Sequence, residues 1–178
     1  MKDKLLTLIL CSTLISVAHG QTARFLSDGM LVISDGARRI RIADISEPPD
    51  HVPTAPYVHV VQKRHGEYFV VVTTSRWTRG YPPKSGGGGA GEEAYVRCLH
   101  VVNGKVLEST EGRFRSWSDN REGGIDGWHG PIFTVTTDDE LEDRVHANQK
   151  DIWQTITYTF DARHPEVGIK EEKGKPHE

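Results

Sequence analysis

Alternation of apolar and polar residues predicts β-strands along much of this chain. In Arg39–Ile42 two isoleucines alternate with two arginines, and in Thr155–Phe160 apolar and aromatic residues alternate with threonines. Successive side chains of a strand point to opposite faces, so each segment should bury one face and expose the other. Phe69–Val72 is instead apolar at every position, which predicts a central strand covered on both sides.

Turn residues separate the predicted strands. Asn103-Gly104 lies between Ala94–Val102 and Lys105–Glu108. Such a pair between apolar runs favours a tight hairpin, because both turn residues take positive φ. The further predicted strands are Met30–Ile33, Tyr57–Lys63, Glu67–Ser75, Arg113–Trp117, Ile132–Thr136 and Asp151–Phe160. The predicted fold is therefore mainly β, as an antiparallel sandwich or a barrel-like meander.

One short helix is predicted near residues 138–149. Thr137–Glu140 has the capping-box pattern, in which Thr137 caps the first turn and Glu140 reaches back to it. The acidic residues also suit the positive start of a helix. The alternative is a calcium site, because Asp138–Asp143 holds five acids in six residues. This stretch lacks the glycine that bends a calcium loop, so the helix is preferred.

The first 20 residues have the order of a secretory signal peptide. Lys2 and Lys4 precede the apolar run Leu5–Val17, and the small-residue exit Ala18-His19-Gly20 follows it. The run of 13 residues is shorter than the roughly 20 that a helix needs to span a bilayer. We therefore expect cleavage after Gly20 and a periplasmic or secreted protein.

This interpretation divides the chain into three parts. Residues 1–20 are the signal peptide, residues 21–169 a single β-rich domain, and residues 170–178 a charged flexible tail. Less favoured alternatives are a membrane anchor, a buried N-terminal helix, and a lipoprotein modified at Cys11. No later apolar run exceeds the length of a strand, so no membrane span is expected after signal removal.

Composition narrows the classes of partner. The 178 residues include 22 basic and 25 acidic side chains, a formal net charge of −3, and removal of the signal segment leaves −4. Nucleic-acid binding relies on a broad positive field, so no nucleic-acid partner is predicted. The mature chain keeps one cysteine, Cys98, so it has no intramolecular disulfide and must rely on its core.

Cys98 and His100 are two residues apart on a predicted strand and should face the same way. A thiol–imidazole pair of this kind could act as a nucleophile. The preferred interpretation is that Cys98 is a small buried residue, because Val96 and Val102 share its face. The other histidines occur singly, and neither a metal site nor a cofactor is predicted.

Two regions are candidates for ligand binding. Trp77, Arg79 and Tyr81 stand at the entrance of the glycine run Gly86–Gly91. Long loops between strands are often functional, and aromatic rings beside a charged group suit ligand contact. The glycines formally match a dinucleotide-binding pattern, but a strand follows them where such a site needs a helix.

The second candidate region is a glycine-rich stretch over residues 117–130. It contains Trp117, Asp126, Trp128 and His129, which are predicted to contact a ligand from a flexible loop. The alternative is that one tryptophan anchors the loop on the core. Residues 119–126 are also acidic and bent by glycine, so they are a better cation candidate than Asp138–Asp143. They do not match the twelve-residue calcium template, and a solvated turn is favoured over a cation site.

Trp77–Pro83, the glycine run and Gly89–Glu93 follow one another immediately before a predicted strand. In this order they resemble a group of small exported bacterial proteins with no assigned activity, over about Ser75–Thr110. The similar sequences carry a cysteine just before Gly-Ala-Gly-Glu and another after the second strand. This chain has Gly88 and Thr110 there, which fits the loss of one disulfide. The resemblance implies no substrate and no catalytic residue.

These features favour an exported, non-catalytic binding or inhibitor-type protein. Its partner would be another protein, such as an exported hydrolase or toxin that it neutralises, or a cell-envelope component. The alternative is a periplasmic hydrolase that uses Asp126 and His129, while the adjacent Glu92 and Glu93 would point to opposite faces of a strand. A third class is an envelope assembly component that adds a strand at an open sheet edge.

Overall fold

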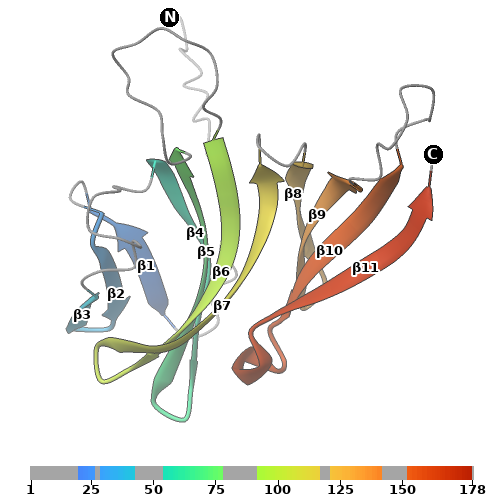
Figure 1. Ribbon diagram of the computed structural model, residues 1–178. Helices are drawn as coiled ribbons and strands as arrows, with labels where there is room; N and C mark the ends of the chain where they lie inside the picture. Colours follow the sequence, from blue (N-terminus) through green and yellow to red (C-terminus); the bar gives the residue numbers. More distant parts are fainter. Residues whose placement is uncertain are drawn as a thin grey trace, which may run out of the picture.

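The computed structural model describes residues 20–26, 29–42, 54–77, 92–116, 121–141 and 152–177. These residues form eleven β-strands and one short 3-10 turn, Pro165–Val167. All the strand pairs are antiparallel, and the strands belong to two sheets of three and eight strands (Figure 1). The predicted antiparallel β architecture is therefore confirmed.

The smaller sheet consists of three five-residue strands in sequence order, namely β1 (Gln21–Phe25), β2 (Leu31–Asp35) and β3 (Arg38–Ile42). A turn at Gly36, where φ is 57°, joins β2 to β3. Ile40 and Ile42 are buried while Arg39 and Arg41 are exposed. The one-sided pattern predicted for this segment is thus confirmed.

The larger sheet is a meander in which each strand pairs with the next one along the chain. Its strands are β4 (Thr54–Arg64), β5 (Glu67–Trp77), β6 (Glu92–Val102), β7 (Lys105–Ser116), β8 (Arg121–His129), β9 (Ile132–Glu140), β10 (Trp153–Asp161) and β11 (Ile169–His177). The predicted Asn103-Gly104 hairpin is confirmed, with φ values of 52° and 79°.

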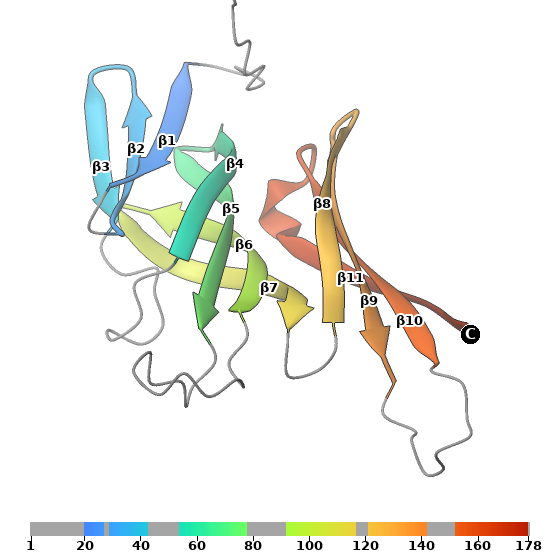
Figure 2. The ribbon, with the colours of Figure 1, turned by 90° about the horizontal axis from the view of Figure 1, so that it is seen from above.

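The eight-stranded sheet folds over between β7 and β8. Only Ser116 and Arg121 pair across this boundary in the described residues, whereas the neighbouring strand pairs share long registers. Viewed from above, β4–β7 lies between the small sheet and the layer β8–β11 (Figure 2). The molecule therefore has three sheet layers and two apolar interfaces.

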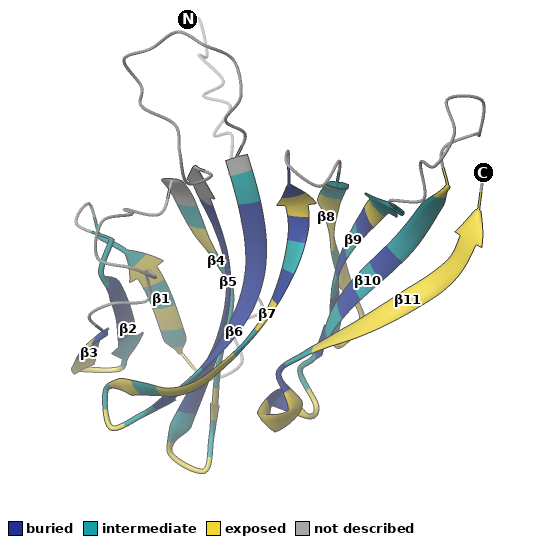
Figure 3. Ribbon diagram, viewed as in Figure 1, coloured by how far each residue is buried: buried dark blue, intermediate teal, exposed yellow. Residues whose placement is uncertain are grey.

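Both faces of β5 and β6 are covered. Phe69, Val71 and Val96 belong to the inner core, which faces β9 and β10, while Val70 and Leu99 belong to a second core against β1–β3. Figure 3 shows β6 buried over most of its length and β11 exposed. The prediction that Phe69–Val72 forms a strand covered on both sides is confirmed.

Polar contacts hold the edges of the folded sheet together. The Gln62 side-chain amide donates to the Ala162 carbonyl at 2.6 Å, and Arg64 pairs with Glu166 at 2.8 Å. On the other edge, the Ile169 amide donates to Thr110 Oγ1 at 2.7 Å. Strand β4 is thereby tied to the β10–β11 connection, and β11 to β7.

The structure corrects three predictions in the second half of the chain. Thr137–Glu140 does not begin a helix but ends strand β9; the rest of the predicted helix, residues 142–149, lies outside the described residues. Residues 121–129, expected in a flexible loop, form strand β8. Lys170–His177, expected in a frayed tail, lies in β11 and pairs with β10.

Tertiary partners explain why the local helix signals fail. Thr137 is 1% exposed, and the Asp139 carboxylate accepts two hydrogen bonds from Arg121 on β8. Asp138 accepts a hydrogen bond from the Thr155 hydroxyl on β10 at 2.8 Å. Acidic residues that would suit the start of a helix therefore bind side chains of the neighbouring strands instead, and these tertiary contacts override the local helix propensity.

None of the described segments is a helix with the length and apolar character needed to cross a bilayer.

Candidate functional site

The most distinctive side-chain cluster of the described residues is a row of four rings. Tyr57 and His59 lie on β4, Phe133 on β9 and Trp128 on β8. The ring centroids are separated by 4.8 Å between Tyr57 and His59, 4.7 Å between His59 and Phe133, and 5.6 Å between Phe133 and Trp128. These separations are those of packed aromatic pairs. We call this cluster the aromatic row.

Local strand geometry explains why the four rings meet. Phe133 faces the inner core, and Trp128 is its cross-strand partner, so both lie on the same face of the β8–β9 pair. The register of β4 against β5 shifts between Val58 and Val60, which turns His59 toward Phe133. A bulge re-aims a side chain in this way. The row therefore crosses from one layer of the folded sheet to the other.

The aromatic row is exposed at its ends and buried in its middle. Tyr57 is 57% exposed and Trp128 is 41% exposed, whereas Phe133 is only 2% exposed. Ile125, on the same strand as Trp128, is a further large apolar side chain that is 46% exposed. Single exposed apolar residues are ordinary, but rings packed against one another at tilted angles offer a continuous surface that could bind a ligand.

His59 contributes no positive charge to this surface near neutral pH. Burial lowers the pKa of its imidazole from 6.5 to about 4. Its Nε2 atom is hydrogen-bonded to the hydroxyl of the buried Thr73 at 2.9 Å. The aromatic row is thus an uncharged surface with one satisfied polar group, suited to a neutral planar or apolar ligand group.

The structure places three of the predicted ligand-binding residues, and it brings only one of them into the aromatic row. Trp128 is part of the row. Asp126 is exposed, and its carboxylate accepts a hydrogen bond from Thr136 at 2.5 Å, while His129 is exposed near the β8–β9 turn. Within the described residues Asp126 and His129 form no ion pair, so the geometry does not couple this acid to this histidine.

The other predicted ligand-binding residues cannot be placed in the same way. Arg79, Tyr81 and Trp117 lie outside the described residues, as does the side chain of Trp77 at the end of β5. The side chain of Glu92 is likewise outside them. Its neighbour Glu93 accepts a hydrogen bond from the Tyr95 hydroxyl at 2.6 Å and pairs with Arg113 at 3.6 Å.

Cys98 is a buried core residue, as predicted. It is 3% exposed, and burial raises the pKa of its thiol to about 12, so the thiolate is disfavoured. His100 does not activate it. The imidazole of His100 stacks on Phe69 with 4.6 Å between ring centroids, and its Nε2 lies 2.7 Å from a Glu67 carboxylate oxygen.

The residues of the two candidate cation sites have other roles, as far as the structure describes them. Asp138 and Asp139 bind Thr155 and Arg121, as described above, and residues 121–126 run along strand β8. In the part of the chain that the structure describes, no group of three or more histidine, cysteine, aspartate or glutamate side chains could hold a metal ion.

Comparison with known proteins adds no assignment. No family model, no curated protein and no solved structure matches this chain. Functional inference therefore depends on the residues themselves.

Sequence reasoning singled out Trp128 but missed Tyr57, His59 and Phe133. Tyr57 and His59 stand two apart on a predicted strand, which is a signal that their rings share a face, but their contact with Phe133 depends on how distant strands pack.

Proposed function

We propose that this chain is an exported, non-catalytic binding protein that holds a protein partner through the aromatic row. The proposal rests on one observation: four rings pack together across two layers, with both end rings exposed and the central histidine neutral. The N-terminal segment, with its lysines, apolar run and small-residue exit, supports export.

The chemistry of the other candidate groups supports binding over catalysis. Asp126 and His129 are exposed and no hydrogen bond or ion pair joins them among the described residues, and Cys98 is buried with a raised pKa. General acid–base catalysis needs groups within reach of one reacting atom, and nucleophilic catalysis needs an activated nucleophile. These residues supply neither in the present geometry, whereas the aromatic row needs no further group to make contact.

Exposure of the end rings favours a protein as the partner. Tyrosine and tryptophan dominate the binding energy of many protein interfaces, because they bury a large area with few rotatable bonds. Tyr57 and Trp128 stand at the surface, and Ile125 adds apolar area beside Trp128. An apolar or aromatic side chain of a partner could rest between these groups and be shielded from water.

Affinity capture from an envelope extract of the source cells tests the proposal. Trp128→Ala and Tyr57→Ala should each reduce recovery of the captured protein at least about tenfold, as expected for hot-spot residues. The matched control is Leu107→Ala, which removes a large apolar side chain that is 69% exposed on β7. Circular dichroism should show that all three variants keep the β fold.

Two results would contradict the proposal. One is capture of the same proteins in equal amount by the wild type and by both aromatic variants. The other is binding of a purified cell-wall oligosaccharide that Trp128→Ala abolishes, which would assign the aromatic row to a sugar ring. The export part is tested separately, because mass spectrometry of the mature product should find Gln21 at its N-terminus, and retention of Met1 would refute cleavage.

A further inference from the structure

The outward face of the small sheet carries three arginines in neighbouring positions. Arg24 on β1 is paired with Val32 on β2, and Val32 is paired with Arg41 on β3. Arg39 lies on the same face of β3, two residues from Arg41, and is paired with Ser34. We call this surface the arginine face. Its position is fixed, because the opposite face of the sheet packs into the second core.

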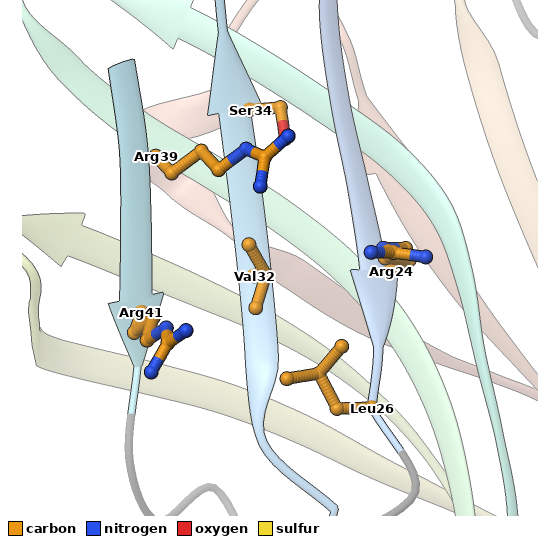
Figure 4. A pocket seen from close by; sticks show the side chains of 6 residues that line it. All are labelled: Arg24, Leu26, Val32, Ser34, Arg39 and Arg41. Atoms are coloured by element: carbon orange, nitrogen blue, oxygen red, sulfur yellow. The ribbon is translucent and has the colours of Figure 1, made fainter.

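The three arginines surround a shallow depression. It has a volume of about 270 Å³ and is lined by Arg24, Leu26, Val32, Ser34, Arg39 and Arg41. Figure 4 shows Arg39 reaching from β3 across to Ser34 on β2, with Arg24 and Arg41 on the two sides of Val32. Guanidinium groups, one hydroxyl and an apolar floor therefore meet in one place.

The arginine face is electrostatically unbalanced. Several other described arginines pair with carboxylates, among them Arg121 with Asp139, Arg97 with Glu111 and Arg163 with Asp161. Arg24, Arg39 and Arg41 have no acidic partner among the described residues, although the chain as a whole carries a net charge of −3. Arg39 and Arg41 lie on one strand, and Arg24 lies on the far side of β2 from them. Like charges gathered around one depression repel each other, and a bound anion would relieve that repulsion.

The side-chain chemistry indicates which anion fits. Guanidinium groups stay charged at all ordinary pH values and bind the oxygens of phosphate in a fork geometry. Three of them match a phosphate dianion with three terminal oxygens better than they match a single carboxylate. Leu26 and the mostly buried Val32 place apolar surface next to the charges, where the organic part of a ligand would rest.

We propose that the arginine face is a binding site for a phosphate monoester attached to an apolar body. This site is separate from the aromatic row and does not depend on the protein partner proposed above. The same chemistry could come from a soluble organic phosphate or from a phosphorylated lipid headgroup. Binding should weaken as salt is added, because exposed charges are screened over about 8–10 Å at physiological ionic strength.

Calorimetric titration with phenyl phosphate at low salt tests the site. Arg39→Gln and Arg41→Gln should each weaken binding about tenfold, since each removes a charge-assisted hydrogen bond. Arg38→Gln is the matched control, because it removes the same charge from the same strand at a position that does not line the depression. It should change the dissociation constant by less than about twofold, because adjacent residues of a strand point to opposite faces and the screened charge of Arg38 lies outside the depression.

Vesicle sedimentation distinguishes the two sources. Phosphatidylcholine vesicles containing phosphatidic acid should retain the wild type more than Arg41→Gln if the site takes a lipid headgroup. Binding of phenyl phosphate without this retention indicates a soluble ligand, and either result supports the site.

The proposal is overturned if neither phenyl phosphate nor the acidic vesicles bind, or if Arg38→Gln weakens binding as much as Arg41→Gln does. Trp128→Ala should bind phenyl phosphate like the wild type, so failure of the aromatic row and failure of the arginine face remain distinguishable.

Discussion

The two layers that cover β4–β7 are built in different ways. In the small sheet, short strands bury an apolar face: Leu31 and Ile33 are 0% exposed, and Ile40 and Ile42 complete the contact. In β8–β11, only β9 and β10 supply buried side chains to the inner core. No residue of β8 or β11 is buried. These outer strands depend on backbone pairing and polar contacts with their neighbours.

This difference shows what apolar alternation can and cannot reveal. Strands that make their own core display the pattern, and β2 and β3 do so clearly. A strand whose backbone pairs with an already buried neighbour needs few apolar side chains, so its sequence can resemble a loop or a tail. The contrast can be tested with three changes to the β8–β11 layer and its contacts: the close fit of β8, the protonation of His59 on β4 where it meets this layer, and the polar pair between β8 and β9.

The largest effect is expected where β8 passes close to its neighbours. A Cβ atom on Gly123 would lie 2.2 Å from the Phe114 carbonyl oxygen and 2.6 Å from that of Thr136. Both contacts are with backbone, so neither can move aside cheaply. We expect Gly123→Ala to lower the free energy of unfolding by about 2–3 kcal/mol, the cost of overpacking, in a urea titration.

The next residue provides a matched control. Gly124 has open space where a Cβ would be, so Gly124→Ala should change stability by less than about 0.5 kcal/mol. Equal effects of the two substitutions would mean that β8 is not held by close backbone fit. The contrast between the two covering layers would then lose its main support.

Gly123 also shows which feature of the fold the sequence alone does not reveal. The sequence predicts the antiparallel β class, the Asn103 hairpin and the two-sided burial of Phe69–Val72. The glycine-rich stretch around Gly123 is typical of a flexible loop, because glycine weakens a strand when its tertiary contacts are unknown. The close approach of the Phe114 carbonyl, which requires glycine, depends on a fold between β7 and β8 that local patterns do not encode.

Prediction of the aromatic row from the sequence is limited in the same way. Trp128 could be selected because an aromatic residue beside charged groups suggests ligand contact. His59 could not, because its contacts with Phe133 and Thr73 arise from the register shift of β4 and from packing between layers. Residue type and spacing can nominate a side chain, whereas the surface it joins follows from tertiary structure.

A smaller effect on stability is expected from a change of pH, which acts on His59 where β4 meets the β8–β11 layer. The pKa of His59 is lowered from 6.5 to about 4, so the unfolded chain gains a proton at higher pH than the folded one. The corresponding stability is fully present above pH 6.5 and is lost as the pH falls from 6.5 to 4. Because His59 is only partly buried, we expect a loss on the order of 2 kcal/mol.

His59→Gln, which keeps a hydrogen-bonding group near Thr73, should remove this part of the pH dependence. The measurement is the difference between wild-type and variant unfolding free energies across that pH range, which cancels the titration of carboxylates common to both. His129→Gln, at an exposed position on β8, should follow the wild type. Hydrogen exchange at low pH should increase in β9 before it increases in β2, and the reverse order would contradict the contrast.

The smallest of the three effects concerns the polar pair that links β8 to β9. Asp139 accepts hydrogen bonds from Arg121 at 2.9 and 2.5 Å, and the two side chains are 18% and 14% exposed. Asp139→Asn keeps the shape but removes the charge, so we expect a loss of about 1–1.5 kcal/mol in unfolding free energy. Asp126→Asn, at an exposed position on β8, should cost less than about 0.5 kcal/mol. If both variants were equally mild, polar pairing would contribute little to β8. Its stability would then come almost entirely from the backbone ladder and the close fit at Gly123.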